Sequence, residues 1–66
     1  MSFAKTIEMT AESREGFRDA IRKGIDKATS TLDEVRSVWV EDQMVTIKDG
    51  STDQFRVRLK VTFQLK

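Results

Sequence analysis

The chain has no cysteine and no histidine among its 66 residues. Without them it can form neither a disulfide nor an iron–sulfur or typical zinc site, and it lacks the commonest general base. A domain of this length buries only about 60% of the surface that its unfolded chain exposes, so small domains usually need crosslinks, metals or self-association. Self-association is the supplement that remains. We therefore expect a homo-oligomer that is not an enzyme.

An excess of charge of either sign is also lacking, since twelve Lys and Arg residues balance eleven Asp and Glu residues. Such a chain has no overall field that attracts nucleic acid or an anionic membrane. No segment approaches the roughly 20 apolar residues that span a bilayer, and residues 1–11 lack the pattern of a signal peptide. We expect one domain over residues 1–66, in the cytoplasm, with no membrane partner.

The residue pattern predicts an α+β domain with its elements in the order β-α-β-β. Residues 2–10 alternate, with Phe3, Ile7 and Met9 on one side, as in a strand with one buried face. Apolar residues then recur three and four positions apart, which predicts a helix with Ser13 as N-cap and an end near Leu32. This stripe consists of Phe17, Ala20, Ile21, Gly24, Ile25, Ala28 and Leu32. Gly24 costs roughly 1 kcal/mol of helix propensity, so its presence there suggests close packing on the sheet.

The second half of the chain predicts a long β-hairpin. Residues 35–48 are rich in Val, Ile, Thr and Trp, and Asp49-Gly50 is a residue pair that tight hairpin turns prefer. Residues 55–65 then alternate regularly between apolar and polar. The apolar residues change parity between Val40 and Val45, so we expect a β-bulge within residues 41–44. The result is a three-stranded antiparallel sheet wrapped on one helix, with a polar second face.

Two features of that polar face point to binding. Trp39 lies with Ser37 on the side turned from the helix, where it could stack on a planar ligand or be buried against another subunit. Arg56, Arg58 and Lys60 form a row that could bind phosphate or nucleic acid. We favour salt bridges as the partners of this row, from another subunit or another strand, because neighbouring like charges on a strand need compensation. The acidic candidates for these bridges are Glu8, Glu41 and Asp42.

Carboxylates also gather in the sequence around the hairpin, at Glu41, Asp42, Asp49 and Asp53. Hard divalent cations bind oxygen ligands of this kind, although the spacing matches no calcium-binding loop. Glu41 and Asp42 are therefore weak candidates for a metal site, and solvated hairpin charges are the simpler interpretation.

Taken together, the order and spacing of these segments resemble the dodecin family. The resemblance rests on the first strand with Thr10-Ala11-Glu12-Ser13, the helix register of residues 17–28, the stretch Val38 to Gln43 and the closing residues 55–63. Membership implies a hollow shell of twelve copies that commonly binds flavin, FMN or riboflavin, between symmetry-related subunits. Some dodecin-like proteins lack the flavin residues and are associated with metal cations instead.

The resemblance also implies where a ligand would lie. The family stacks flavin on a tryptophan of the second strand and binds the ring edge with a glutamine of the third. Gapless comparison places these two positions at Ser37 and Arg56, while Trp39 is displaced by about 6.6 Å along the strand. The candidate ligand-binding residues are Ser37, Trp39, Gln43, Arg56 and Arg58. Flavin, a divalent cation or an anion are the expected ligands, and a nucleic-acid-binding module is the remaining alternative.

Overall fold

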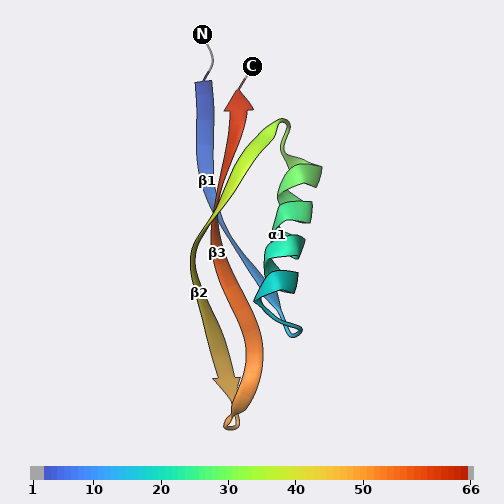
Figure 1. The fold of residues 1–66 in the computed structure, drawn as a ribbon, viewed down its shortest axis with the longest axis vertical. Helices are drawn as coiled ribbons and strands as arrows, with labels where there is room; N and C mark the ends of the chain where they lie inside the picture. The colour runs from blue at the N-terminus through green and yellow to red at the C-terminus, as the bar shows by residue number, and fades with distance from the viewer. Residues whose placement is uncertain (1–2, 66) are drawn as a thin grey trace.

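The computed structural model describes residues 3–65, which form one helix packed on a three-stranded antiparallel sheet (Figure 1). The elements are β1 (Phe3–Ser13), α1 (Phe17–Thr31), β2 (Val35–Lys48) and β3 (Ser51–Leu65). β3 lies in the middle of the sheet and pairs with both other strands. The predicted α+β fold and its β-α-β-β order are confirmed. Ser2, the predicted start of the first strand, lies outside the described residues.

The junction between β1 and α1 differs from the prediction. β1 continues to Ser13, because Ala11 and the buried Ser13 extend the alternation on the helix side, opposite Val57 and Phe55. The prediction that Ser13 is the helix N-cap is wrong, since α1 begins at Phe17, after Gly16 with a φ of 141°. The Ser13 hydroxyl still makes hydrogen bonds at the junction between β1 and α1. It accepts a hydrogen bond of 2.9 Å from the backbone N–H of Glu15.

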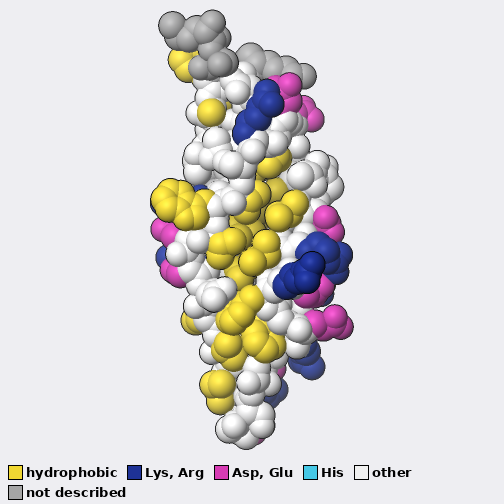
Figure 2. Space-filling view, in the orientation of Figure 1, with side chains coloured by type: hydrophobic (Ala, Val, Ile, Leu, Met, Phe, Trp, Pro, Cys, Tyr) yellow, Lys and Arg dark blue, Asp and Glu magenta, His cyan; other side chains and the backbone are white. Residues whose placement is uncertain are grey.

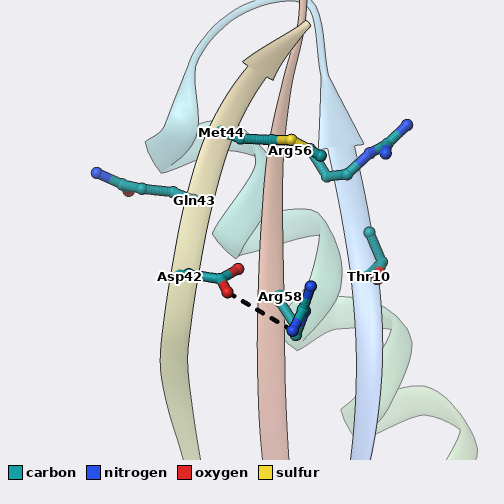
Figure 3. A pocket seen from close by; sticks show the side chains of 6 residues that line it. All are labelled: Thr10, Asp42, Gln43, Met44, Arg56 and Arg58. Atoms are coloured by element: carbon teal, nitrogen blue, oxygen red, sulfur yellow. Dashed lines mark ion pairs between the residues drawn. The ribbon is translucent and has the colours of Figure 1, made fainter.

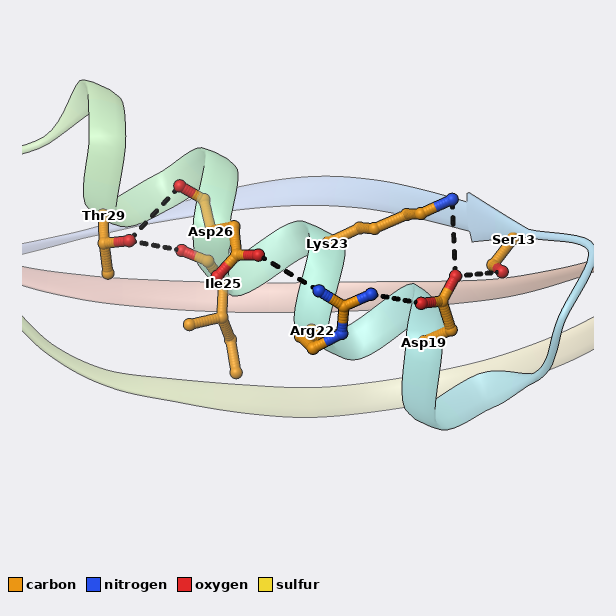
Figure 4. Close-up of polar contacts among 7 residues, drawn as sticks. All are labelled: Ser13, Asp19, Arg22, Lys23, Ile25, Asp26 and Thr29. Atoms are coloured by element: carbon orange, nitrogen blue, oxygen red, sulfur yellow. Dashed lines mark hydrogen bonds and ion pairs between the residues drawn. The ribbon is translucent and has the colours of Figure 1, made fainter.

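Asp19, in the first turn of α1, links the helix to the end of β1 (Figure 4). Its carboxylate accepts hydrogen bonds from the Ser13 hydroxyl at 2.5 Å and the Arg22 guanidinium at 2.6 Å, and Lys23 lies 3.3 Å away. The Ser13 and Arg22 hydrogen bonds lower the pKa of Asp19 to about 2. A carboxylate here also faces the positive end of the helix dipole. The cluster therefore fixes the start of the helix against the sheet.

The core forms where small residues of α1 meet the middle of β3. Its buried members are Ala20, Gly24 and Ala28 on the helix and Val57, Leu59 and Val61 on the strand. A Cβ atom added at Gly24 would overlap the Leu59 side chain and lie 3.3 Å from the Cβ of Ala11. The expected close approach at Gly24 is thus confirmed. Within residues 3–65, no helix is long and apolar enough to cross a membrane.

The β2–β3 hairpin has the predicted turn and the predicted bulge. Asp49 and Gly50 both have positive φ, 52° and 76°, as a type I′ turn requires. The register shifts between Val40 and Asp42 and leaves Glu41 unpaired. Because of this shift, Val40 faces Leu59 and Val45 faces Phe55, so the apolar residues on both sides of the bulge lie on the helix side.

The helix covers only part of the apolar face of the sheet. α1 contacts β1 and β3 more than β2, and the hairpin continues past the helix (Figure 1). A band of hydrophobic side chains consequently runs along the long axis of the molecule (Figure 2). We call this band the apolar strip, and its members are Ile25, Val38, Val40, Val45, Ile47 and Phe55. Contiguous apolar surface of this kind marks an interaction site in soluble proteins.

Candidate functional site

The side of the sheet turned from α1, which we call the polar face, carries most of the predicted ligand residues. The register orders its side chains in four rungs across β1, β3 and β2. These rungs are Thr6–Thr62–Ser37, Glu8–Lys60–Trp39, Thr10–Arg58–Asp42 and Glu12–Arg56–Met44. Successive rungs are about 6.6 Å apart, which is the spacing of every second residue on a strand. Ser37 and Arg56 therefore lie roughly 20 Å apart on one chain, whereas Trp39 and Arg58 occupy adjacent rungs.

The three cations of β3 are all paired with carboxylates of the same chain. Arg56 lies 2.9 Å from Glu12, and Lys60 lies 3.4 Å from Glu41. Arg58 lies between Asp42 at 3.6 Å and Glu8 at 3.9 Å. The predicted partners Glu8, Glu41 and Asp42 are confirmed, and the flanking strands of the same chain supply them rather than another subunit. Sequence reasoning missed Glu12, since the first strand was predicted to end before it.

These ion pairs determine the net charge of the polar face but contribute little to the stability of the fold. Their side chains are between 33% and 58% exposed, and exposed ion pairs contribute only about 0–1 kcal/mol each. Four carboxylates face three cations, so this cluster has a formal net charge of −1. An anion approaching the row meets no unpaired cation among the three, which argues against nucleic-acid binding there.

Trp39 stands out from this charged surface. Its side chain is 70% exposed, in the rung of Lys60 and next to the rung of Ser37. Exposing a large indole to water is unfavourable, and its flat apolar surface suits stacking against an aromatic ring or burial in an interface. The hydroxyls of Thr6 and Thr62 bond each other at 2.9 Å in the neighbouring rung. The indole thus lies between a hydroxyl-bearing rung and a charged one.

A hollow of about 350 Å³ opens on the same face, one rung from Trp39 (Figure 3). It is lined by Thr10, Asp42, Gln43, Met44, Arg56 and Arg58. Asp42 and Arg58 form an ion pair across it, and the Met44 side chain extends toward Arg56. Arg56 and Arg58 thus both line the hollow. Gln43, which lies opposite Val57, lines it too, but its side chain points away from those of the other five residues.

The carboxylates considered for a metal do not form one group. Glu41 and Asp42 are neighbours at the bulge, but each is paired with a cation of β3. Asp49 occupies the hairpin turn, seven residues and about 20 Å along the strand from Asp42. In the part of the chain that the structure describes, no three potential ligand residues are close enough to hold a metal ion.

Comparison with known proteins identifies the fold and the family. A family model of the dodecins matches residues 3–66. The chain belongs to the dodecin family. No curated protein is similar enough to match this dodecin in sequence. The family assignment confirms the resemblance that the order of segments suggested.

Solved dodecin structures superimpose on nearly the whole chain. The dodecin of Streptomyces davaonensis is 29% identical, with a TM-score of 0.91 over 98% of this chain and 96% of its own. The dodecin of Streptomyces coelicolor is 26% identical, with a TM-score of 0.92 over 98% of this chain and 93% of its own. A calcium dodecin of Mycobacterium tuberculosis, described as calcium-chelating, is 22% identical, with a TM-score of 0.88 over 98% and 93% of the two chains. At that identity the last comparison supports the fold alone.

Proposed function

We propose that this dodecin is a non-enzymatic homo-oligomer, of twelve copies, that binds and stores a small planar ligand on its polar face. Flavin, as FMN or riboflavin, is the ligand that family membership favours. The observation that carries the proposal is Trp39, a 70% exposed indole on a strand whose neighbours on that face are polar or charged. That the protein is located in the cytoplasm stays a prediction.

Self-association is supported by the apolar strip. Ile47 is 65% exposed and Val45 37% exposed on the helix side of the hairpin, beyond the area that α1 covers. A three-stranded sheet with one helix and no crosslink is a small core, and covering this strip with another copy would enlarge it. The strip and the polar face lie on opposite sides of the sheet. A copy seated on the strip would therefore leave Trp39 accessible.

Trp39 is the residue that fits a flavin ring, at a position one rung from Ser37. Ser37 offers no π surface, and Arg56 only donates hydrogen bonds and carries a charge. An aromatic pair contributes about 0.5–1.5 kcal/mol beyond the area that it buries. We infer that the ring stacks on Trp39 and that the ligand extends toward the hollow beside Arg58, the next rung.

Titration of riboflavin with the purified protein tests this proposal. Stacking on indole quenches flavin fluorescence, so the parent protein is expected to quench strongly and Trp39→Ala weakly. Trp39→Phe is the matched control, because it keeps a stacking ring and should retain part of the affinity. If the parent does not quench flavin, or if Trp39→Ala binds as tightly as the parent, flavin binding at Trp39 is refuted.

If the titration shows that the protein does not bind flavin, cation binding is the alternative function. Its ligands would be Glu41 and Asp42, which are already paired with Lys60 and Arg58. A cation would have to displace those side chains, so the geometry favours it less than a stacked ring. Calcium titration of a protein that does not bind flavin is the corresponding measurement.

A further inference from the structure

We propose that the polar face selects an uncharged planar aromatic ligand over a phosphate-bearing one with the same ring. This inference rests on the proposed function, because it concerns which flavin-like molecule the site around Trp39 accepts. It follows from the charges that surround the indole and from the way in which each of them is paired.

Three carboxylates, Glu8, Asp42 and the bulge residue Glu41, surround the two cations nearest Trp39. Lys60, across from Trp39, has its ammonium 3.4 Å from Glu41, and Glu8 is its partner on β1. One rung on, the guanidinium of Arg58 lies between Glu8 and Asp42. Both cations nearest the indole are therefore compensated, and with Glu41 counted the three carboxylates give this group a formal net charge of −1. A neutral ring meets no electrostatic penalty there.

The hollow is where the side chain of a stacked ligand would extend, and it offers no free cation to a phosphate. Of the two arginines that line it, Arg58 is paired with Asp42 and Arg56 with Glu12. The Arg56 pair is the tighter, at 2.9 Å, and Glu12 also accepts a bond of 3.1 Å from the Arg56 Nε. A phosphate monoester carries about −1.5 to −2 charges at neutral pH, so it would have to compete with these carboxylates.

Riboflavin and FMN are suitable probes, because they share a ring and differ by one phosphate. A unit negative charge about 8 Å from such a phosphate disfavours its binding by roughly threefold at low salt, about 0.01 M, where the Debye length is about 30 Å. We expect riboflavin to bind about threefold more tightly than FMN at low salt. The ratio should approach one at high salt, since screening removes the repulsion.

The variant that tests the charge argument is Glu12→Gln, which removes one carboxylate and releases Arg56. It should raise the affinity for FMN about fivefold and leave that for riboflavin nearly unchanged, because only the phosphate responds to the free guanidinium. Asp26→Asn is the matched control. It removes one negative charge from the exposed side of α1, where Asp26 lies 3.6 Å from Arg22.

The binding ratios decide the proposal. Tighter binding of riboflavin at low salt, with the preference lost or reversed in Glu12→Gln and kept in Asp26→Asn, supports it. Tighter binding of FMN by the parent protein, or an FMN to riboflavin ratio that Glu12→Gln does not change, overturns it while leaving flavin binding intact. If neither flavin binds, the proposed function fails and this inference fails with it.

Discussion

Gly24→Ala tests the packing of the helix on the sheet, because two effects of opposite sign meet at this residue. Replacing Gly by Ala in a helix interior stabilises it by about 1 kcal/mol. The added methyl group would overlap the buried Leu59 side chain and approach Ala11. Overpacking of a core costs about 1–3 kcal/mol, so the variant should be less stable than the parent by up to about 2 kcal/mol. The outcome depends on how far Leu59 can move.

A double-mutant cycle with Leu59→Val isolates the steric effect. Valine lacks the terminal methyl group that the new Cβ would meet, so Gly24→Ala should cost at least about 1 kcal/mol less in the Leu59→Val background than in the parent. Urea unfolding followed by circular dichroism measures both, at one fixed protein concentration because assembly contributes to apparent stability. If Gly24→Ala stabilised the parent by about 1 kcal/mol regardless of residue 59, the close approach would be refuted.

Three further predictions concern polar residues. The pKa of Asp19 is lowered to about 2, so its contribution to stability is complete above the ordinary value of 3.8 and is lost as the pH falls toward 2. In thermal melts from pH 5 downward, the melting temperature of Asp19→Asn should therefore fall less steeply with pH than that of Asp26→Asn. Arg58→Glu would place a third carboxylate beside Glu8 and Asp42, and should lower the melting temperature at low salt more than at high salt; equal losses would argue against charge repulsion. Glu34 has a φ of 51°, a left-handed conformation that costs a residue with a side chain about 1–2 kcal/mol. Glu34→Gly should therefore keep the stability of the protein and Glu34→Val should lower it. A Val variant more stable than the Gly variant would contradict the left-handed conformation.

Local rules account for the parts of the fold that the sequence predicted. Alternation on β3, the helix stripe and the Asp49-Gly50 turn each depend on neighbouring residues, and the change of parity after Val40 revealed the bulge. Ser13 was assigned wrongly because serine is a common N-cap, while its actual place depends on pairing with the distant Phe55. Propensity cannot report such long-range pairing.

The candidate site was predicted less completely, for the same reason. Trp39 and the β3 cations were placed on the correct face by alternation, but their partners depend on register. Because β1 extends to Ser13, Glu12 lies opposite Arg56 and pairs with it. A strand that was predicted to end at Thr10 could not predict this pair. The face on which Gln43 lies depends on which residue of the bulge is unpaired; with Glu41 unpaired, Gln43 lies opposite Val57. The sequence limited the bulge to four residues and could not choose among them.

The molar mass of the purified protein in solution tests the central claim most directly. The apolar strip, the small core and family membership together predict an assembly of twelve chains, each of 7.6 kDa. Light scattering coupled to size exclusion at micromolar concentration should therefore give about 91 kDa, twelve times the chain mass. Mutating Ile47 to Lys, on the strip, should reduce that mass, whereas the same change at Thr46, on the opposite side of β2, should not. A folded and stable species of 7.6 kDa would contradict the account.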